Sequence, residues 1–234
     1  MNGSTRAMLY MALKNLNDAA RNSLDGTQIE KIKNLVNNFA ITAAILGAAS
    51  DVIPGAGGIL AALAQTGIIW TLYVKINLAL EISISEHTIK FVGSAIATNI
   101  ITNAGYMIIA YAAAAIMSFI PLFGQAGSAM IHLGLGYMLV YAAAVIYLNF
   151  LTRTFKAKGS FTFDESDETK RAINDTVNDS HVNDLIKEGK NAFKEAKANG
   201  DIDRAKNNLK CPSCGASITT TQKFCSSCGM QLQK

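Results

Sequence analysis

Four cysteines in two close pairs are the residues of this chain whose spacing points most directly to chemistry. The first pair stands in Cys211-Pro-Ser-Cys214-Gly215, the second in Cys225-Ser-Ser-Cys228-Gly229, and ten residues separate Cys214 from Cys225. Two residues between thiolates let one reversal of the chain present both sulfurs to a single ion. The glycine after each pair allows the left-handed turn that aims backbone N–H groups at the sulfurs. The pattern therefore predicts a four-thiolate metal site with Cys211, Cys214, Cys225 and Cys228 as its ligands.

Zinc is the metal that this ligand set favours, because Zn2+ accepts a closed tetrahedral shell of four sulfurs. A rubredoxin-like iron site and redox-active cysteines are the two alternatives. A closed shell leaves no position for water or substrate, so we expect a structural ion. The segment resembles a short zinc ribbon, in which residues 216–221 supply the hairpin strand and Phe224 supplies a small apolar contact.

Catalytic machinery is not visible in the rest of the sequence. We find no nucleophile paired with a base, no pair of carboxylates, and no G-x-x-x-x-G-K-S/T phosphate loop. We therefore expect a protein that is not an enzyme.

The elements that carry the ribbon are dominated by a long stretch without charge. Residues 91–152 contain no Asp, Glu, Lys or Arg, and residues 34–150 contain five: Asp51, Lys75, Glu81, Glu86 and Lys90. Unpaired charge in hydrocarbon is costly, so bilayer-embedded helices have this composition and soluble proteins seldom do. The stretch predicts a membrane domain, with the lipid bilayer as a partner.

Two proline-glycine corners divide the apolar stretch into two helical hairpins. A shift of 67 residues superposes Ile53-Pro54-x-x-Gly57 on Ile120-Pro121-x-x-Gly124, and Gly67 on Gly134, which indicates an internal repeat. Small residues at four-residue spacing, such as Ala40 and Ala44, allow close helix packing. The fold class expected is an all-α membrane protein, with about four transmembrane or re-entrant helices and a small C-terminal zinc ribbon of four cysteines.

Lysine and arginine positions set the expected orientation. They lie before the first hairpin, between the hairpins and after the last helix, and the corners have none. The positive-inside rule then places both termini in the cytoplasm, at a bacterial inner membrane. Helices that cross the bilayer are favoured because the arms approach spanning length, and hairpins that dip in from the cytoplasmic side are the alternative.

Four domains follow from these patterns. Residues 1–26 hold an amphipathic helix over 5–21 whose apolar face includes Leu9, Leu13 and Leu16, either a lid on the membrane or bundle, or an ordinary packing helix. Residues 27–155 form the hairpin domain, which Thr27-Gln-Ile-Glu30 opens as a capping box. Residues 156–210 are a charged linker with an amphipathic helix over about 182–198, and residues 211–234 are the ribbon.

Isolated polar residues in the apolar stretch have two interpretations. His132, Gln65, Asn77, Asn99 and Asn103 either bond neighbouring helices or line a polar path. Bonding between helices is the reading we favour.

The corners and the final helix resemble a known family. The motifs Asp51-Val-Ile-Pro-Gly-Ala-Gly-Gly58 and Ile120-Pro-x-x-Gly-Gln125, with Gln65 and a Gly/Tyr-rich last helix, are similar to the YcjF-like hydrophobic domain (domain of unknown function 697) over about residues 30–152. That domain is often fused to, or found beside, bacterial GTPases. The resemblance implies that a GTPase partner would be a separate protein.

These features predict an integral membrane adaptor or scaffold whose cytoplasmic zinc ribbon recruits a protein partner. One alternative is a membrane-active effector that forms a pore or remodels the bilayer, for which the helices would homo-oligomerise. A second alternative is a membrane tether for nucleic acid, which the modest basic charge of the ribbon disfavours.

Overall fold

The structure is a computed structural model that describes residues 6–21, 23–49, 57–119, 124–207, 211, 213–218 and 224–231. Within these ranges the side chains of 47–49, 57–65, 104–119, 124–132 and 207 are not described. The corner residues Asp51, Pro54 and Pro121 therefore lie outside the described residues, as do the side chains of Gln65 and His132.

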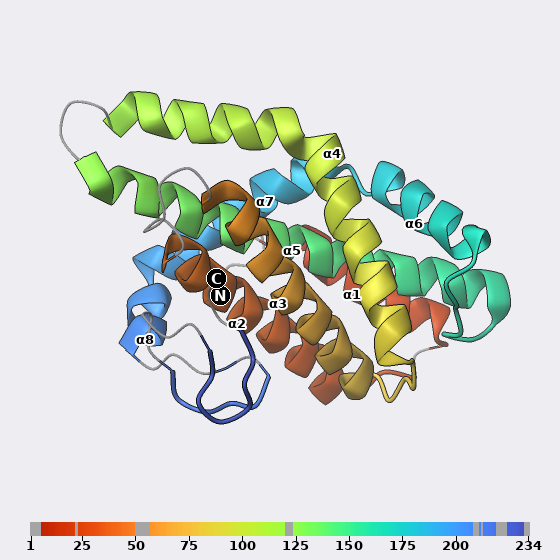
Figure 1. Cartoon of the computed structure of the whole chain (residues 1–234). Helices are drawn as coiled ribbons and strands as arrows, with labels where there is room; N and C mark the ends of the chain where they lie inside the picture. The colour runs from red at the N-terminus through yellow and green to blue at the C-terminus, as the bar shows by residue number, and fades with distance from the viewer. Residues whose placement is uncertain are drawn as a thin grey trace.

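Eight helices make up the described part of the chain, and that part contains no β-strand (Figure 1). They are α1 (Ala7–Ala19), α2 (Gly26–Ala49), α3 (Gly57–Ala79), α4 (Glu86–Phe119), α5 (Gly124–Lys158), α6 (Asp167–Asp179), α7 (Val182–Ala198) and α8 (Asp201–Asn207). The helices α3 and α5, which follow the two corners, begin 67 residues apart, at the spacing of the sequence repeat.

Helix α5 lies at the centre of the bundle. It packs most extensively on α2, and it also contacts α1, α3, α4, α6 and α7. The segment Leu133–Lys158 is long and apolar enough to cross a membrane, with a mean hydropathy of 1.7, but 83% of its apolar window is buried inside the protein. No other helix among the described residues meets these criteria, so the expectation of about four membrane crossings finds little support here.

Two tyrosines join α3 to the middle of α5. The rings of Tyr73 and Tyr147 stack with their centroids 3.9 Å apart, and both side chains are fully buried. The Tyr73 hydroxyl donates to the Ala143 carbonyl at 2.8 Å, and the Tyr147 hydroxyl donates to Asn77 Oδ1 at 2.8 Å. Each buried hydroxyl therefore has an acceptor, which removes the cost of burying it unpaired.

Helix α1 packs on α5 through Leu9, Ala12, Leu13 and Leu16, all buried. This is the ordinary packing role that its apolar face allowed. Its first turn carries no acidic residue and no capping side chain of its own. The Glu188 carboxylate of α7 supplies the missing acceptor, because it receives the N–H groups of Met8 at 3.0 Å and of Leu9 at 3.4 Å. The Tyr141 hydroxyl donates to the same carboxylate at 2.7 Å, so Glu188 links α1, α5 and α7.

The charged segment after α5 differs from a simple linker. It forms α6 and α7, and both pack on α4 and α5. Helix α7 has the expected bounds, Val182–Ala198, and buries Leu185, Ile186 and Phe193. A Cβ atom at Gly189 would lie 3.2 Å from Met138 Cα, so glycine at this position permits the close approach of α7 to α5.

The start of α2 is capped two residues earlier than expected. The Asp25 carboxylate accepts the Gln28 N–H at 2.7 Å, and Gln28 Oε1 accepts the Asp25 N–H at 3.1 Å. This is a reciprocal capping box with Asp and Gln in its two positions. The Thr27–Glu30 assignment was therefore wrong, and Glu30 instead pairs with Lys33 at 2.5 Å.

Helix α4 changes direction near its middle, and its C-terminal part runs beside the start of α5 away from the bundle (Figure 1). Side chains near the middle of α4 donate to carbonyls of their own helix. Asn99 Nδ2 donates to Ala95 O, Thr102 Oγ1 to Thr98 O and Asn103 Nδ2 to Asn99 O, each at 2.9 Å. Side-chain bonds of this kind bend helices.

The close approach at Gly189 generates a stability prediction. We expect Gly189→Leu to lower the free energy of unfolding by about 1–3 kcal/mol, because the new side chain must displace α5 backbone. Urea unfolding followed by circular dichroism measures this. Asn191→Leu, at an exposed position of the same helix, is the control and should be nearly neutral. Equal stability of the two variants would contradict the packing shown here.

The Glu188 bridge generates a second prediction. Glu188→Ala leaves the first N–H groups of α1 and the Tyr141 hydroxyl without their acceptor, at a cost of about 1–3 kcal/mol. Amide hydrogen exchange should become faster in α1 specifically. Lys187→Ala, an exposed neighbour, should leave α1 protection unchanged. Unchanged exchange of α1 in the Glu188 variant would show that the apolar face alone holds the helix.

Candidate metal centre

Two nearly identical turns build the cysteine site. In the first, Gly215 N–H donates to Cys211 O at 2.8 Å and Cys211 N–H to Ala216 O at 2.7 Å. In the second, Gly229 N–H donates to Cys225 O at 2.9 Å and Cys225 N–H to Met230 O at 2.8 Å. Both glycines have positive φ, 76° at Gly215 and 71° at Gly229. The left-handed turn after each pair is therefore confirmed.

The turns bring the four predicted ligands together. The sulfurs of Cys211, Cys214, Cys225 and Cys228 all lie within 4.8 Å of one another. Cys211 Sγ is 3.6 Å from Cys228 Sγ, and Cys214 Sγ is 3.5 Å from Cys225 Sγ. Sulfurs at about 2.3 Å from a tetrahedral Zn2+ stand about 3.8 Å apart, whereas a disulfide needs about 2.05 Å. The spacing fits four ligands of one zinc ion.

Backbone N–H groups donate to the sulfurs of Cys211 and Cys225, which favours the thiolate form that binds a metal cation. Bonds from Ser227 and Cys228 lower the pKa of the Cys225 thiol to about 6. Burial raises the pKa of Cys211 to about 12, although the N–H groups of Cys214 and Ser213 oppose this rise. The Cys211 thiol, which burial favours in its protonated form, becomes a thiolate when a divalent ion binds.

The apolar contact of the ribbon is different from the one expected. Ile218 is buried, and Met230 Sδ lies 4.0 Å from Cys211 Sγ. Phe224, which was expected to fill this role, is 56% exposed and forms an isolated antiparallel bridge with Gln231. The assignment of Phe224 as a packing residue was therefore wrong, because bridge pairing left its side chain on the outer face.

The polar residues of the apolar stretch bond other parts of the protein. Asn77 accepts from Tyr147, and Asn99 Nδ2 donates to Asn174 Oδ1 of α6 at 3.0 Å. Asn103 bonds within α4. The contacts of Asn77 and Asn99 follow the interpretation of bonds between helices, whereas the contact of Asn103 lies within one helix. Sequence patterns did not indicate Glu188, because a glutamate on a charged helix carries no signal that it caps a helix 180 residues away.

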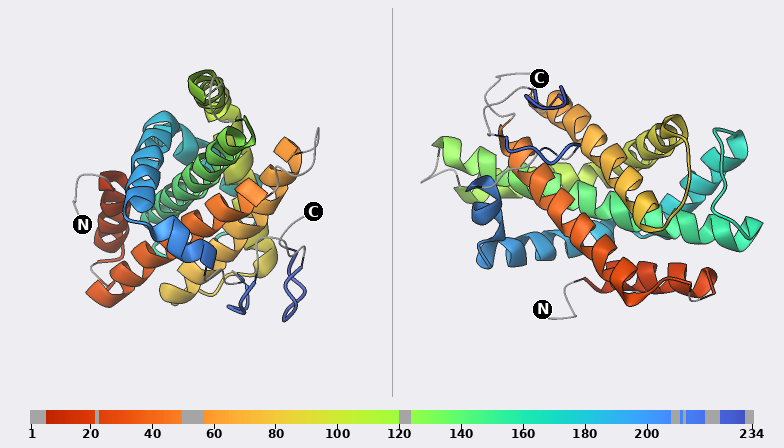
Figure 2. Two further views of the ribbon diagram at one scale, coloured as in Figure 1. Left: turned by 90° about the vertical axis from the view of Figure 1, so that its left-hand side faces the viewer. Right: turned by 90° about the horizontal axis from the view of Figure 1, so that it is seen from below.

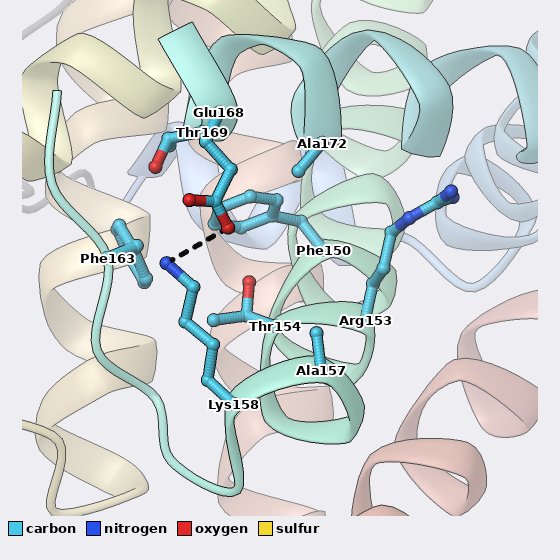
Figure 3. A pocket seen from close by; sticks show the side chains of 9 residues that line it. All are labelled: Phe150, Arg153, Thr154, Ala157, Lys158, Phe163, Glu168, Thr169 and Ala172. Atoms are coloured by element: carbon cyan, nitrogen blue, oxygen red, sulfur yellow. Dashed lines mark ion pairs between the residues drawn. The ribbon is translucent and has the colours of Figure 1, made fainter. Parts of the chain in front are cut away.

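A hollow of about 90 Å³ lies between the end of α5, α6 and the segment that joins them (Figure 3). Its lining is mostly apolar, including Phe150, Phe163 and Ala172. Lys158 Nζ stands 3.5 Å from Glu168 Oε1 at its rim, so the charged groups satisfy each other. This hollow offers a ligand no unpaired charge, and the cysteine cluster remains the candidate site.

Comparison with known proteins identifies one domain. Residues 210–232 match the zinc-ribbon domain family, which agrees with the geometry of the four cysteines. The YcjF-like domain is not found over residues 30–152, so that resemblance is unsupported. No curated protein and no solved structure matches the chain. The C-terminal module is a zinc ribbon, and its four cysteines form a structural zinc site.

Zinc removal should unfold the ribbon and leave the helical bundle folded. We expect one zinc per chain, released by a chelator or by Cys211→Ser, with little loss of helical circular dichroism because none of the described helices carries a ligand. Ser213→Ala is the matched control, since Ser213 bonds the sulfur through its backbone N–H. Zinc content measured with a colorimetric chelator should stay normal in that control. Collapse of the helical signal on zinc loss would show that the bundle depends on the ribbon.

Proposed function

We propose that this protein is a membrane-associated adaptor whose zinc ribbon recruits a protein partner. The helical hairpins hold it at the cytoplasmic face of a bacterial inner membrane, and the ribbon presents a rigid surface to the cytoplasm. The proposal is supported by a metal shell built from four sulfurs, which has a structural role and leaves binding to the ribbon's surface. Homo-oligomerisation is compatible with this role, and it remains a separate prediction that the adaptor role does not require.

Phe224 is the observation that carries the proposal. A phenylalanine that is 56% exposed on a metal-stapled turn needs little further ordering of its backbone on docking, because the bridge to Gln231 already holds that backbone. Aromatic residues of this kind dominate binding energy at protein interfaces. The partner is then a protein with an apolar pocket, and a GTPase would follow only from the family resemblance.

The other two functions have less support. A pore needs polar side chains directed into a path, but Asn77 and Asn99 have partners within the protein. Nucleic-acid binding needs basic residues with several aromatic residues for stacking, and in the described ribbon residues Phe224 is the only aromatic residue. An adaptor requires neither.

Affinity purification from solubilised membranes tests the proposal. We expect Phe224→Ala to lose a partner that the wild-type protein retains, with affinity reduced about tenfold or more, as expected when an interface anchor is truncated. Zinc content should stay normal, since Phe224 is not a ligand. Cys211→Ser should lose the same partner by unfolding the ribbon.

Ser226→Ala provides the control, because Ser226 is an exposed residue of the same ribbon. It should retain both zinc and partner. If the Phe224 and Ser226 variants bring down the same proteins in the same amounts, the ribbon surface is not the recruiting site. Loss of the partner from the wild-type protein on nuclease treatment would instead identify nucleic acid as the bridge.

A further inference from the structure

Part of the hairpin α4–α5, within the stretch that has no charged residues, extends beyond the bundle (Figure 1). The first buried side chain described on α5 is Leu133, and the last strongly buried side chain described on α4 is Ile100. Between them lie the helical segments 104–119 and 124–132, which run together away from the other helices in both figures (Figures 1 and 2). Their sequence has no Asp, Glu, Lys or Arg. We name these two helical segments the α4–α5 arm.

Two cationic side chains, Arg6 and Lys194, lie beside residues that contact Tyr137, which follows the arm on α5. Tyr137 donates to Asn37 Oδ1 at 3.0 Å, and Arg6 donates to the same oxygen at 3.0 Å. On another side, Phe193 of α7 packs on the Tyr137 ring with centroids 5.9 Å apart, and its neighbour Lys194 is exposed. Charged groups at this level exclude hydrocarbon from the surface around Tyr137, because burying them in lipid is costly.

The length of the arm then limits how far it reaches. The 9 residues 124–132 extend about 14 Å, and the 16 residues 104–119 extend about 24 Å, at 1.5 Å per residue. A hydrocarbon core is about 30 Å thick. An arm of this length ends before it reaches the far headgroups while the charged body stays in water.

We infer that the α4–α5 arm inserts into one leaflet of an anionic bilayer from the side of the body and does not cross it. The arm lies obliquely, because segment 104–119 extends about 24 Å and is longer than half of a hydrocarbon core about 30 Å thick. The exposed Lys194, next to Phe193 in the chain, meets anionic headgroups. This inference rests on the proposed membrane association and replaces the crossing arrangement with a one-sided one.

Insertion is tested by flotation of the full-length, zinc-loaded protein with phosphatidylcholine vesicles containing phosphatidylglycerol. Ala126→Lys places a charge in the arm and should weaken binding about tenfold or more. Asn15→Lys adds the same charge to an exposed position of α1 and should bind as wild type or more tightly. Equal binding of the two variants, or no binding of the wild-type protein, would overturn the inference.

Tryptophan quenching tests the depth. The chain has one tryptophan, Trp70, whose indole donates to Ser94 Oγ at 3.2 Å and lies 5.8 Å from Lys90 Nζ, within the body. Its fluorescence should be unaffected by acyl-brominated lipids. Leu122→Trp in a Trp70→Phe background should be quenched by those lipids and should resist iodide trapped inside the vesicles.

Quenching of Leu122→Trp by the trapped iodide would show that the hairpin crosses, and quenching of Trp70 by brominated lipid would show that the body enters hydrocarbon. Either result overturns one-sided insertion and leaves partner recruitment by Phe224 intact. If Phe224→Ala does not affect partner recruitment while the quenching results are as expected, the adaptor proposal is overturned and one-sided insertion stands. The two proposals therefore fail separately.

Discussion

The need to cover α5 from water is the constraint on which the rest of the bundle depends. Between Tyr137 and Leu151 this helix has no side that suits solvent, and most of its side chains are fully buried. Burying apolar surface is worth about 25 cal/mol per Å², so a helix that is apolar all round demands neighbours on every side. Those neighbours are the hairpin partners α2, α3 and α4, together with the charged helices α1, α6 and α7.

The charged helices cover α5 because each has one apolar face and one polar face. Helices α1 and α7 place their apolar faces on α5 and meet at Glu188, whose carboxylate serves both the first turn of α1 and Tyr141. The bridge makes the position of α1 depend on that of α7. Segments from the two ends of the chain therefore close the same core, and the body behaves as one packed unit rather than an anchor with appendages.

The sequence allowed the local features to be predicted more reliably than the environment of the apolar helices. The ribbon was predicted correctly because ligand spacing and positive-φ glycines are local properties. The bounds of α7 followed from the spacing of Leu185, Ile186 and Phe193. By contrast, a run without charge is equally suited to lipid and to a protein core, and only the tertiary packing of α1, α6 and α7 distinguishes them. Phe224 and Asp25 depended on single pairings that no periodicity records.

The two parts of the chain are stabilised by different physics, and this separation suits an adaptor. The bundle depends on apolar burial around α5, whereas the ribbon is too small for a core and depends on metal–sulfur bonds. Its described surface can therefore vary to fit a partner without disturbing the bundle. Conversely, a change in the α4–α5 arm need not alter the ribbon, because no zinc ligand lies on any of the eight described helices. In the proposed adaptor, location and recognition are then set by independent segments, joined through α8.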